Sequence, residues 1–248
     1  MNPCLLIPIY DHGQTIDRVV LSLAHFGLPL LIVDDGSHVS TKQELQRIAA
    51  REPWITLLRR DLNGGRGAAL KDGYRLAHEN GFTHAIQLDA DGQHAATDVP
   101  RMLNALKAHP EALVLGAPIF DSSIPKARLY GRQLSRVMVW ISTLSFAVED
   151  PLCGFRGVPL QPTIELLGVA KTGDHMEFDP EFCVRLAWSG TRVVNVPTRV
   201  VYDPMGLSHF DTLRDNLRLT WTYTRLLGGA VFRSPSLLRN RQKKATHD

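Results

Sequence analysis

The sequence has few cysteines and no long apolar run. Its three cysteines, Cys4, Cys153 and Cys183, are far apart, odd in number and without the CxxC spacing of a metal or redox site. This pattern favours reduced thiols in a cytoplasmic protein, two of them filling the core. No window reaches the roughly 18 apolar residues that a membrane-spanning helix requires. The start of the chain has no basic leader or small-residue cleavage site, so we expect no signal peptide.

Signs of disorder, repeats and low complexity are also missing. With 248 residues, of which 44% are hydrophobic and 21% charged, the chain suits one well-buried domain. The formal net charge is only +3, and we expect no nucleic-acid partner. The charge is uneven, because eight Lys or Arg lie between Leu207 and Lys244 against two Asp. This segment fits either contact with an anionic membrane surface or a solvated terminal helix with a basic tail.

The first 120 residues alternate short apolar runs with helix-period stretches, a pattern typical of an α/β fold. The runs are nearly all apolar, which predicts a mostly parallel, Rossmann-like sheet that is covered on both faces. Thr41 with Glu44 predicts a capping box, and Thr97 a helix cap. We expect strands at Cys4–Ile9, Leu30–Val33, Trp54–Leu58, His84–Leu88 and Leu113–Leu115, and helices at Thr15–Phe26, Thr41–Arg51, Gly67–Asn80 and Asp98–Ala108.

The second half predicts a different arrangement. A long helix is expected over Lys126–Phe146, followed by a turn at Cys153–Arg156 and a loop at Lys171–Pro180 that leads into a helix. A further strand is expected near Arg192–Val196, and a last helix from about Ser208.

Polar clusters follow the expected strands at their carboxyl ends, where ligands bind in such sheets. Asp89-Ala90-Asp91 comes directly after a buried strand, so both carboxylates can reach one hard cation, Mg²⁺ or Mn²⁺. Gln93 adds a carbonyl oxygen, and the metal would bridge a diphosphate. The alternative is a plain Asp-rich turn, which the position after the strand and the neighbouring Gln93 and His94 make less favourable.

Two other strand ends predict contacts to a nucleotide. A carboxylate of Asp34-Asp35-Gly36-Ser37 can accept hydrogen bonds from a base or a ribose, although Asp-Gly turns are common. In Asn63–Gly67 the glycines permit close approach of a ligand, and Arg66 adds charge beside a helix N-terminus that favours anions. This segment is neither GxGxxG nor GxxxxGK[ST], so dinucleotide and P-loop sites are disfavoured.

In this order, the segments resemble the family-2 inverting glycosyltransferases of GT-A fold. The resemblance is closest to the branch of dolichyl- or polyprenyl-phosphate mannosyl- and glucosyltransferases, and covers roughly residues 3–203. It implies a nucleotide-binding half and an acceptor-side half. The segments that carry it are Ile7–Tyr10, Val33–Ser37, Asn63–Leu70, Leu88–His94, Asp150–Arg156 and Glu177–Asp179.

The resemblance implies a donor site and a metal site. Asp89, Asp91 and Gln93 would hold Mg²⁺ or Mn²⁺ and the diphosphate, and Asp35 with Tyr10 and Pro8 would hold the base and ribose. Tyr10-Asp11-His12 stands where the family has an Asn-Glu pair, which leaves the base open between UDP and GDP. The residues expected to line the donor site are therefore Pro8, Tyr10, Asp35, Arg66, Asp89, Ala90 and Asp91.

The sequence does not decide which residue is the catalytic base. Asp179 stands at the position of the family's Glu-Asp motif, and Glu177 and Asp174 are alternatives. A lipid-phosphate acceptor arrives ionised and needs no base. Arginines would then bind its phosphate oxygens, and His209 could touch the donor or the acceptor. The arginines are Arg128, Arg132 and Arg156; the stripe of Arg128, Arg132 and Arg136 fits equally a solvated helix face.

These observations lead to one hypothesis and two rivals. We expect a metal-dependent inverting glycosyltransferase that moves a sugar from a UDP- or GDP-sugar to a lipid-like acceptor, such as polyprenyl phosphate or an aryl-polyene lipid. The rivals are a nucleotidyltransferase and a catalytically silent sugar-nucleotide-binding scaffold. We expect a transferase domain over residues 1–206, and over residues 207–248 an amphipathic helix and basic tail. The tail would contact the inner face of the membrane from the cytoplasm.

Overall fold

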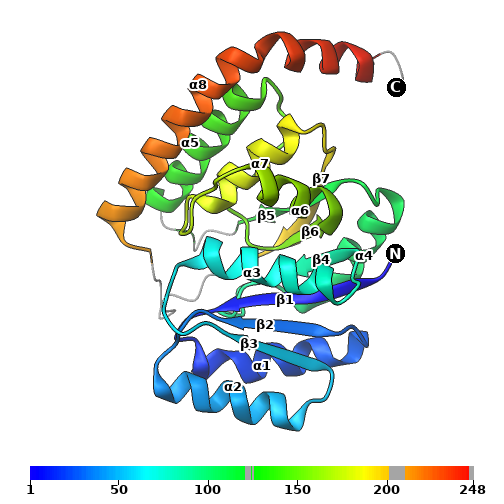
Figure 1. The fold of residues 1–248 in the computed structure, drawn as a ribbon, viewed down its shortest axis with the longest axis vertical. Helices are drawn as coiled ribbons and strands as arrows, with labels where there is room; N and C mark the ends of the chain where they lie inside the picture. The colour runs from blue at the N-terminus through cyan, green and yellow to red at the C-terminus, as the bar shows by residue number, and fades with distance from the viewer. Residues whose placement is uncertain (121–123, 125, 201–209, 246–248) are drawn as a thin grey trace.

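The computed structural model describes residues 1–120, 124, 126–200 and 210–245. Its centre is a seven-stranded sheet of order β3-β2-β1-β4-β6-β5-β7, in which β6 alone runs antiparallel to its neighbours β4 and β5 (Figure 1). The strands are β1 (Pro3–Ile9), β2 (Leu30–Asp34), β3 (Ile55–Arg59), β4 (His84–Gln87), β5 (Leu113–Ile119), β6 (Arg156–Pro159) and β7 (Val193–Arg199).

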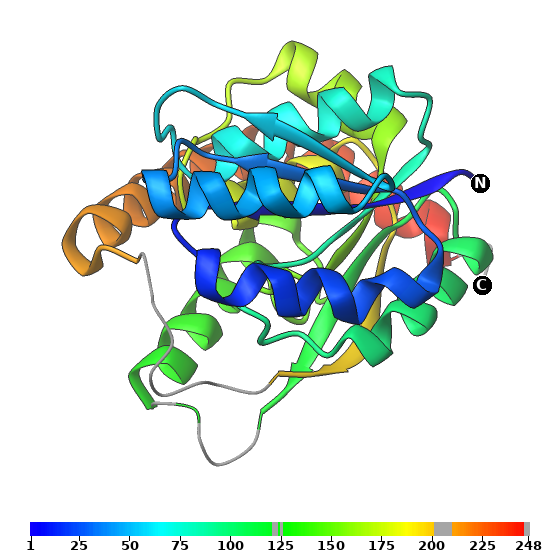
Figure 2. The same ribbon diagram turned by 90° about the horizontal axis from the view of Figure 1, so that it is seen from below.

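Helices cover both faces of the sheet, as the apolar strands require. One face packs on α1, α2 and α4, and the other on α3, α5, α6, α7 and α8 (Figures 1 and 2). The helices are α1 (Gly13–Leu23), α2 (Val39–Arg51), α3 (Arg66–Glu79), α4 (Val99–Ala108), α5 (Lys126–Thr143), α6 (Leu160–Val169), α7 (Phe178–Trp188) and α8 (Thr212–Ala245).

The predicted strands and helices of the first 120 residues are confirmed to within a few residues, and the α/β class with them. Two predicted caps are wrong. Helix α2 begins at Val39, which places Thr41 inside the helix and buries it, and no side chain caps the helix. Helix α4 follows Asp98 rather than Thr97, and again no side chain caps it.

The sequence did not predict β6, because the turn expected at Cys153–Arg156 ends in this strand. Its antiparallel run pairs Arg156 with Gln87, the last residue of β4. The loop before β6 therefore lies at the carboxyl ends of the parallel strands, beside Asp89. This edge of the sheet holds the candidate site.

The C-terminal helix packs against α5 and α7 (Figure 1). The predicted division at residue 206 falls outside the described residues and stays a prediction, as does the role of His209. In the described parts of the chain, no helix combines the length and the apolar character needed to span a bilayer.

Candidate active site

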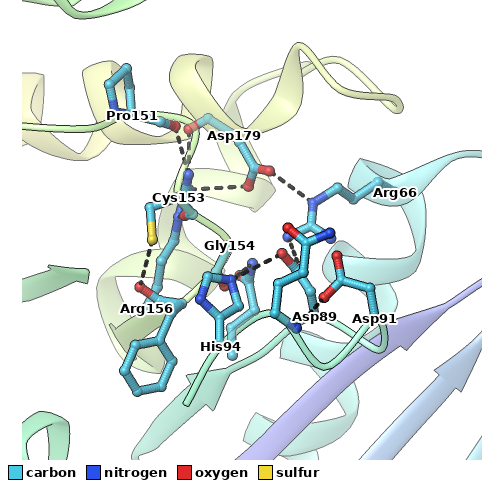
Figure 3. A network of polar contacts seen from close by, with 12 residues as sticks. Arg66, Asp89, Asp91, His94, Pro151, Cys153, Gly154, Arg156 and Asp179 are labelled. Carbon is cyan, nitrogen blue, oxygen red and sulfur yellow. Dashed lines mark hydrogen bonds and ion pairs between the residues drawn. The ribbon is translucent and has the colours of Figure 1, made fainter. Parts of the chain in front are cut away.

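The turn after β4 is fixed by hydrogen bonds at two points. The hydroxyl of Thr15, on α1, donates to the carbonyl oxygen of Ala90 at 2.7 Å. The backbone N–H of Gln93 donates to Asp91 Oδ1 at 2.9 Å, and Gly92 adopts a φ of +75° that closes the turn. The turn thus brings the carboxylates of Asp89 and Asp91 to the same edge of the sheet (Figure 3).

A chain of alternating charges links this turn to α7 (Figure 3). Arg66 Nη2 lies 2.6 Å from Asp89 Oδ1, and Arg66 Nε donates to Asp179 Oδ2 at 2.8 Å. Arg156 Nη1 lies 3.1 Å from the other oxygen of Asp179. Residues from the turn after β4, from α3, α7 and β6 therefore meet at one point, and Arg66 joins the predicted metal turn to the predicted catalytic carboxylate.

The two carboxylates of the turn differ in their pKa values. Burial raises the pKa of Asp91, and the charge of Asp89 adds to the increase. Burial would also raise the pKa of Asp89, but Arg66 and His94 outweigh it and hold this pKa far below its usual range. Asp89 Oδ1 is buried and has no hydrogen bond, only the ion pair with Arg66.

The same turn fits a hard divalent cation. Two carboxylates and the Gln93 amide offer the oxygen ligands that Mg²⁺ and Mn²⁺ prefer. Among the residues that the structure describes, no group of three or more His, Cys, Asp and Glu side chains is placed to hold a metal. The remaining ligands would therefore come from a substrate, for which diphosphate oxygens are suited.

Arg156 does not lie where the sequence placed it. Its side chain is completely buried and donates to the carbonyl oxygens of Cys153 and Pro151, each at 2.7 Å, and to that of Asp179 at 3.2 Å. The guanidinium is thus used to fix the loop before β6 and the start of α7. A direct phosphate contact by Arg156 is not what this geometry supports.

The glycines of Asn63–Gly67 permit close approach, but the group that approaches them is another segment of the same chain and not a ligand. A Cβ at Gly65 would lie 2.3 Å from the ring of His175, and one at Gly67 would lie 2.5 Å from Phe178 Cβ. The N–H of Ala68, in the first turn of α3, donates to the Asp174 carbonyl at 2.9 Å. The segment before α7 thus covers part of the N-terminus of α3, where the sequence predicted an anion-binding site.

Asp35 lies at the expected strand end, and local hydrogen bonds already engage it. It accepts bonds from the backbone N–H groups of Gly64 at 3.0 Å and Gly65 at 2.8 Å, and Arg60 lies 3.2 Å away. Burial raises the pKa of Asp35. The carboxylate therefore fixes the Gly-rich loop, and a contact to base or ribose would use its remaining lone pairs.

The end of β1 departs from ordinary backbone geometry. Asp11 has a φ of +54°, and its N–H donates to the Ser37 hydroxyl at 2.9 Å. Its carboxylate accepts from the backbone and the ring of His38, and the Tyr10 ring lies 6.2 Å from that ring. Of the predicted base-binding residues, Tyr10 thus lies beside the segment that follows β2, and Pro8 is buried within β1.

The three candidate catalytic carboxylates differ in their surroundings. Asp179 is buried and both of its oxygens face guanidinium groups. Glu177 Oε1 accepts from the N–H groups of Asp174 and His175 at 3.1 and 3.3 Å, which closes the loop before α7. Asp174 is more than half exposed and pairs with Lys71. Only Asp179 lies in direct contact with the network of the metal turn.

The arginines of α5 do not form one solvated face. Arg132 pairs with the buried Asp150 at 2.6 Å, and the guanidinium of Arg136 lies 4.8 Å from the Trp140 ring centre. Arg128 is exposed at the start of the helix.

The sequence assigns no role to Gln87 and indicates His94 only as a neighbour of the metal turn. Gln87 is fully buried, accepts from the Tyr74 hydroxyl and donates to the Gly154 carbonyl at 2.9 Å. His94 Nε2 lies 3.3 Å from Asp89 Oδ2, with its ring stacked on Phe155. A glutamine inside an otherwise apolar strand was the available signal for Gln87.

Gly154 supports Asp89 from the loop before β6, and its replacement gives a first prediction. A Cβ at this position would lie 2.0 Å from Asp89 Oδ2, so Gly154→Ala must displace the carboxylate. We expect the variant to fold but to lose metal-dependent stabilisation by donor nucleotides, measured by thermal unfolding with Mn²⁺ and with EDTA. The control is Gly168→Ala on α6, where a Cβ meets nothing within 4 Å. An unchanged metal response in Gly154→Ala would contradict this role.

Comparison with known proteins places this geometry in a family. The profile of glycosyl transferase family 2 matches residues 4–151. The undecaprenyl-phosphate mannosyltransferase of Micrococcus luteus is 27% identical over 220 residues, which span 84% of this chain and 87% of that protein.

Solved structures confirm the fold. Glucosyl-3-phosphoglycerate synthase from Mycobacterium tuberculosis aligns with a TM-score of 0.67 and 17% identity, over 92% of this chain and 80% of its own. A mannosyltransferase from Pyrobaculum calidifontis, in complex with GDP-Man and Mn²⁺, aligns with a TM-score of 0.59 and 17% identity. The alignment covers 99% of this chain and 80% of that protein's chain.

The chain belongs to glycosyl transferase family 2 and has the GT-A fold. It is a glycosyltransferase, and the expected fold and enzyme class are confirmed.

Proposed function

We propose that this glycosyltransferase moves a sugar from a UDP- or GDP-sugar to a lipid phosphate, such as a polyprenyl phosphate, with Mg²⁺ or Mn²⁺ at Asp89, Asp91 and Gln93. The observation that carries the proposal is the pair of half-buried carboxylates, Asp89 and Asp91, at the carboxyl edge of the sheet, with Asp89 in contact with Arg66. The name of the Micrococcus luteus relative supports the acceptor class. The metal, when bound, would neutralise charge on the leaving diphosphate.

The residues of the chain have separate tasks in this reaction. Asp35 would fix the Gly-rich loop beside the nucleotide, and Tyr10 with Pro8 would lie at the base. Arg66, as a cation beside Asp89, is placed to bind diphosphate oxygens as charge develops on them. An oxygen of the lipid phosphate would attack the anomeric carbon while the bond to the nucleoside diphosphate breaks, which inverts the configuration.

The surroundings of Asp179 favour an acceptor that arrives ionised. Both of its oxygens face the guanidinium groups of Arg66 and Arg156, which compete with a hydroxyl proton for the same lone pairs. In this proposal Asp179 orients Arg66, and no proton is removed from the acceptor. Arg128 and Arg132 stay candidates for contacts to the lipid phosphate.

A transfer assay tests the acceptor. The protein is incubated with labelled UDP- and GDP-sugars, Mn²⁺ and a short polyprenyl phosphate, with the matching polyprenol as the control acceptor. We expect a sugar-phospholipid product from the phosphate and none from the alcohol. Transfer to the alcohol with the phosphate inert would contradict the proposed acceptor and restore the need for a base.

A further inference from the structure

Exposed apolar side chains are concentrated on two neighbouring helices. Seventeen large apolar side chains are exposed in the described part of the chain, and eleven of them belong to α5, α8 or the residues next to these helices. Elsewhere such side chains occur singly, as is usual on protein surfaces. The eleven are Tyr130, Leu134, Val137, Ile141, Phe146, Phe210, Leu213, Leu217, Trp221, Val231 and Phe232.

On each helix these side chains form one stripe that faces away from the core. Those of α5 recur from Tyr130 at spacings of 4, 3 and 4 residues, and those of α8 run from Leu213 to Trp221 every fourth residue. The opposite sides bury Val139 on α5 and Leu226 on α8. The two helices pack side by side (Figure 1), and we call their outward sides together the α5–α8 face.

This arrangement bears on one alternative that the sequence left open, a solvated face formed by the arginines of α5. The outward stripe of α5 is apolar, while Arg132 and Arg136 lie at its sides and are partly buried. On α8, Trp221 is exposed, whereas Tyr223 and Leu226 are buried. An amphipathic helix that turns its apolar residues to the outside needs a partner for them.

The charge of the two helices identifies the chemistry of that partner. Helices α5 and α8 contain twelve Lys or Arg and one acidic residue, Asp215. From chain totals of 28 basic and 25 acidic residues, this leaves sixteen basic and twenty-four acidic residues elsewhere. A chain of nearly balanced charge therefore carries its positive excess on the two helices that expose the apolar stripes.

We propose that the α5–α8 face docks on a membrane surface that contains anionic lipids. Apolar stripes with Trp and basic residues at their sides suit a helix that lies in the plane of the interface, where the side chains enter the acyl boundary and the cations meet headgroups. A second copy of the chain would bring two strongly basic surfaces together. A nucleic acid would leave the apolar stripes without contacts.

The docking would serve the proposed transfer to a lipid phosphate, and its purpose rests on that function. Helix α7, which carries Asp179, packs against both α5 and α8. A membrane bound at the α5–α8 face would therefore lie beside the part of the molecule that carries the acceptor-side network.

Vesicle sedimentation with the full chain tests the docking. We expect binding to phosphatidylcholine vesicles that contain phosphatidylglycerol, weaker binding without it, and release at high salt. The double variant Leu217→Asp/Trp221→Asp changes side chains that are 63% and 65% exposed, so it should fold. Its vesicle affinity should fall by roughly tenfold or more, because two apolar side chains leave the interface.

The control is Leu21→Asp/Val169→Asp, which changes side chains 56% and 88% exposed on other helices. It should bind vesicles like the unchanged protein. Absence of vesicle binding, or an equal loss in both double variants, would overturn the docking. So would self-association, or binding to duplex nucleic acid, that replaces vesicle binding. Donor stabilisation should be the same in both variants, so a failure of docking is distinguishable from a failure of the transferase function.

Discussion

Asp91→Asn should abolish the effect of Mn²⁺ on donor binding and reduce sugar transfer by roughly 10²- to 10³-fold, the usual cost of removing one electrostatic contact to a developing charge. The asparagine keeps the oxygen that accepts from the Gln93 N–H, so the turn retains its shape. Only the charge that would hold the cation disappears. Isothermal titration with Mn²⁺ and a nucleoside diphosphate measures the effect directly.

The stability of this variant separates a lost site from a damaged fold. Burial, with the charge of Asp89, raises the pKa of Asp91, so its ionised form destabilises the folded protein at neutral pH. Without metal, Asp91→Asn should therefore unfold at a higher temperature than the unchanged protein at pH 7. The difference should shrink as the pH falls and Asp91 becomes protonated. Asp17→Asn, in an exposed ion pair on α1, is the control. A less stable Asp91→Asn would contradict the account of the turn.

Arg66→Met should have opposite effects on metal and donor. In the donor-free protein the Arg66 guanidinium supplies the positive charge beside Asp89, at 2.6 Å. Its removal leaves two carboxylates without that cation, and we expect Mn²⁺ to bind about tenfold more tightly or better, from the Coulomb energy of one lost charge at this range. Transfer should nevertheless fall by roughly 10²-fold or more, because the diphosphate loses a contact.

The conservative variant distinguishes charge from geometry. Arg66→Lys keeps the charge but cannot contact Asp89 and Asp179 through two nitrogens of one planar group, so metal affinity should stay near that of the unchanged protein while transfer is impaired. Arg47→Met, on the surface of α2, controls for general loss of an arginine. Weaker Mn²⁺ binding in Arg66→Met would mean that Arg66 supports the metal site rather than standing in for its charge.

The first half of the fold and the metal turn could be predicted because their signals are local. Leu30–Val33 in β2 is a wholly apolar run, and Asp89 comes two residues after the end of β4, all of whose residues are buried. In contrast, β6 has four residues including Gly157 and Pro159, and it forms by pairing with β4 and β5, which both lie well before it in the chain. No local pattern predicts a strand of that kind.

The same distinction holds within the site. The sequence indicated close approach of a ligand at Gly65 and Gly67, but their neighbours are His175 and Phe178, more than 100 residues away in the chain. Arg156 was expected at a phosphate because it is charged, and the structure buries it as a support for Asp179. Which charged residues face a substrate and which hold the site together depends on contacts between distant segments.

The central claim is that a nucleotide-sugar binds at this edge of the sheet through a metal. The most direct measurement is thermal unfolding with UDP, GDP and their mannose, glucose and N-acetylglucosamine conjugates, each with Mn²⁺ and with EDTA. A ligand that binds only the folded state raises its stability. We predict that nucleotides of one base raise the unfolding temperature in the presence of Mn²⁺, and that this increase disappears with EDTA. No shift with any nucleotide, or a shift indifferent to the metal, would contradict the metal site and favour a plain turn at Asp89.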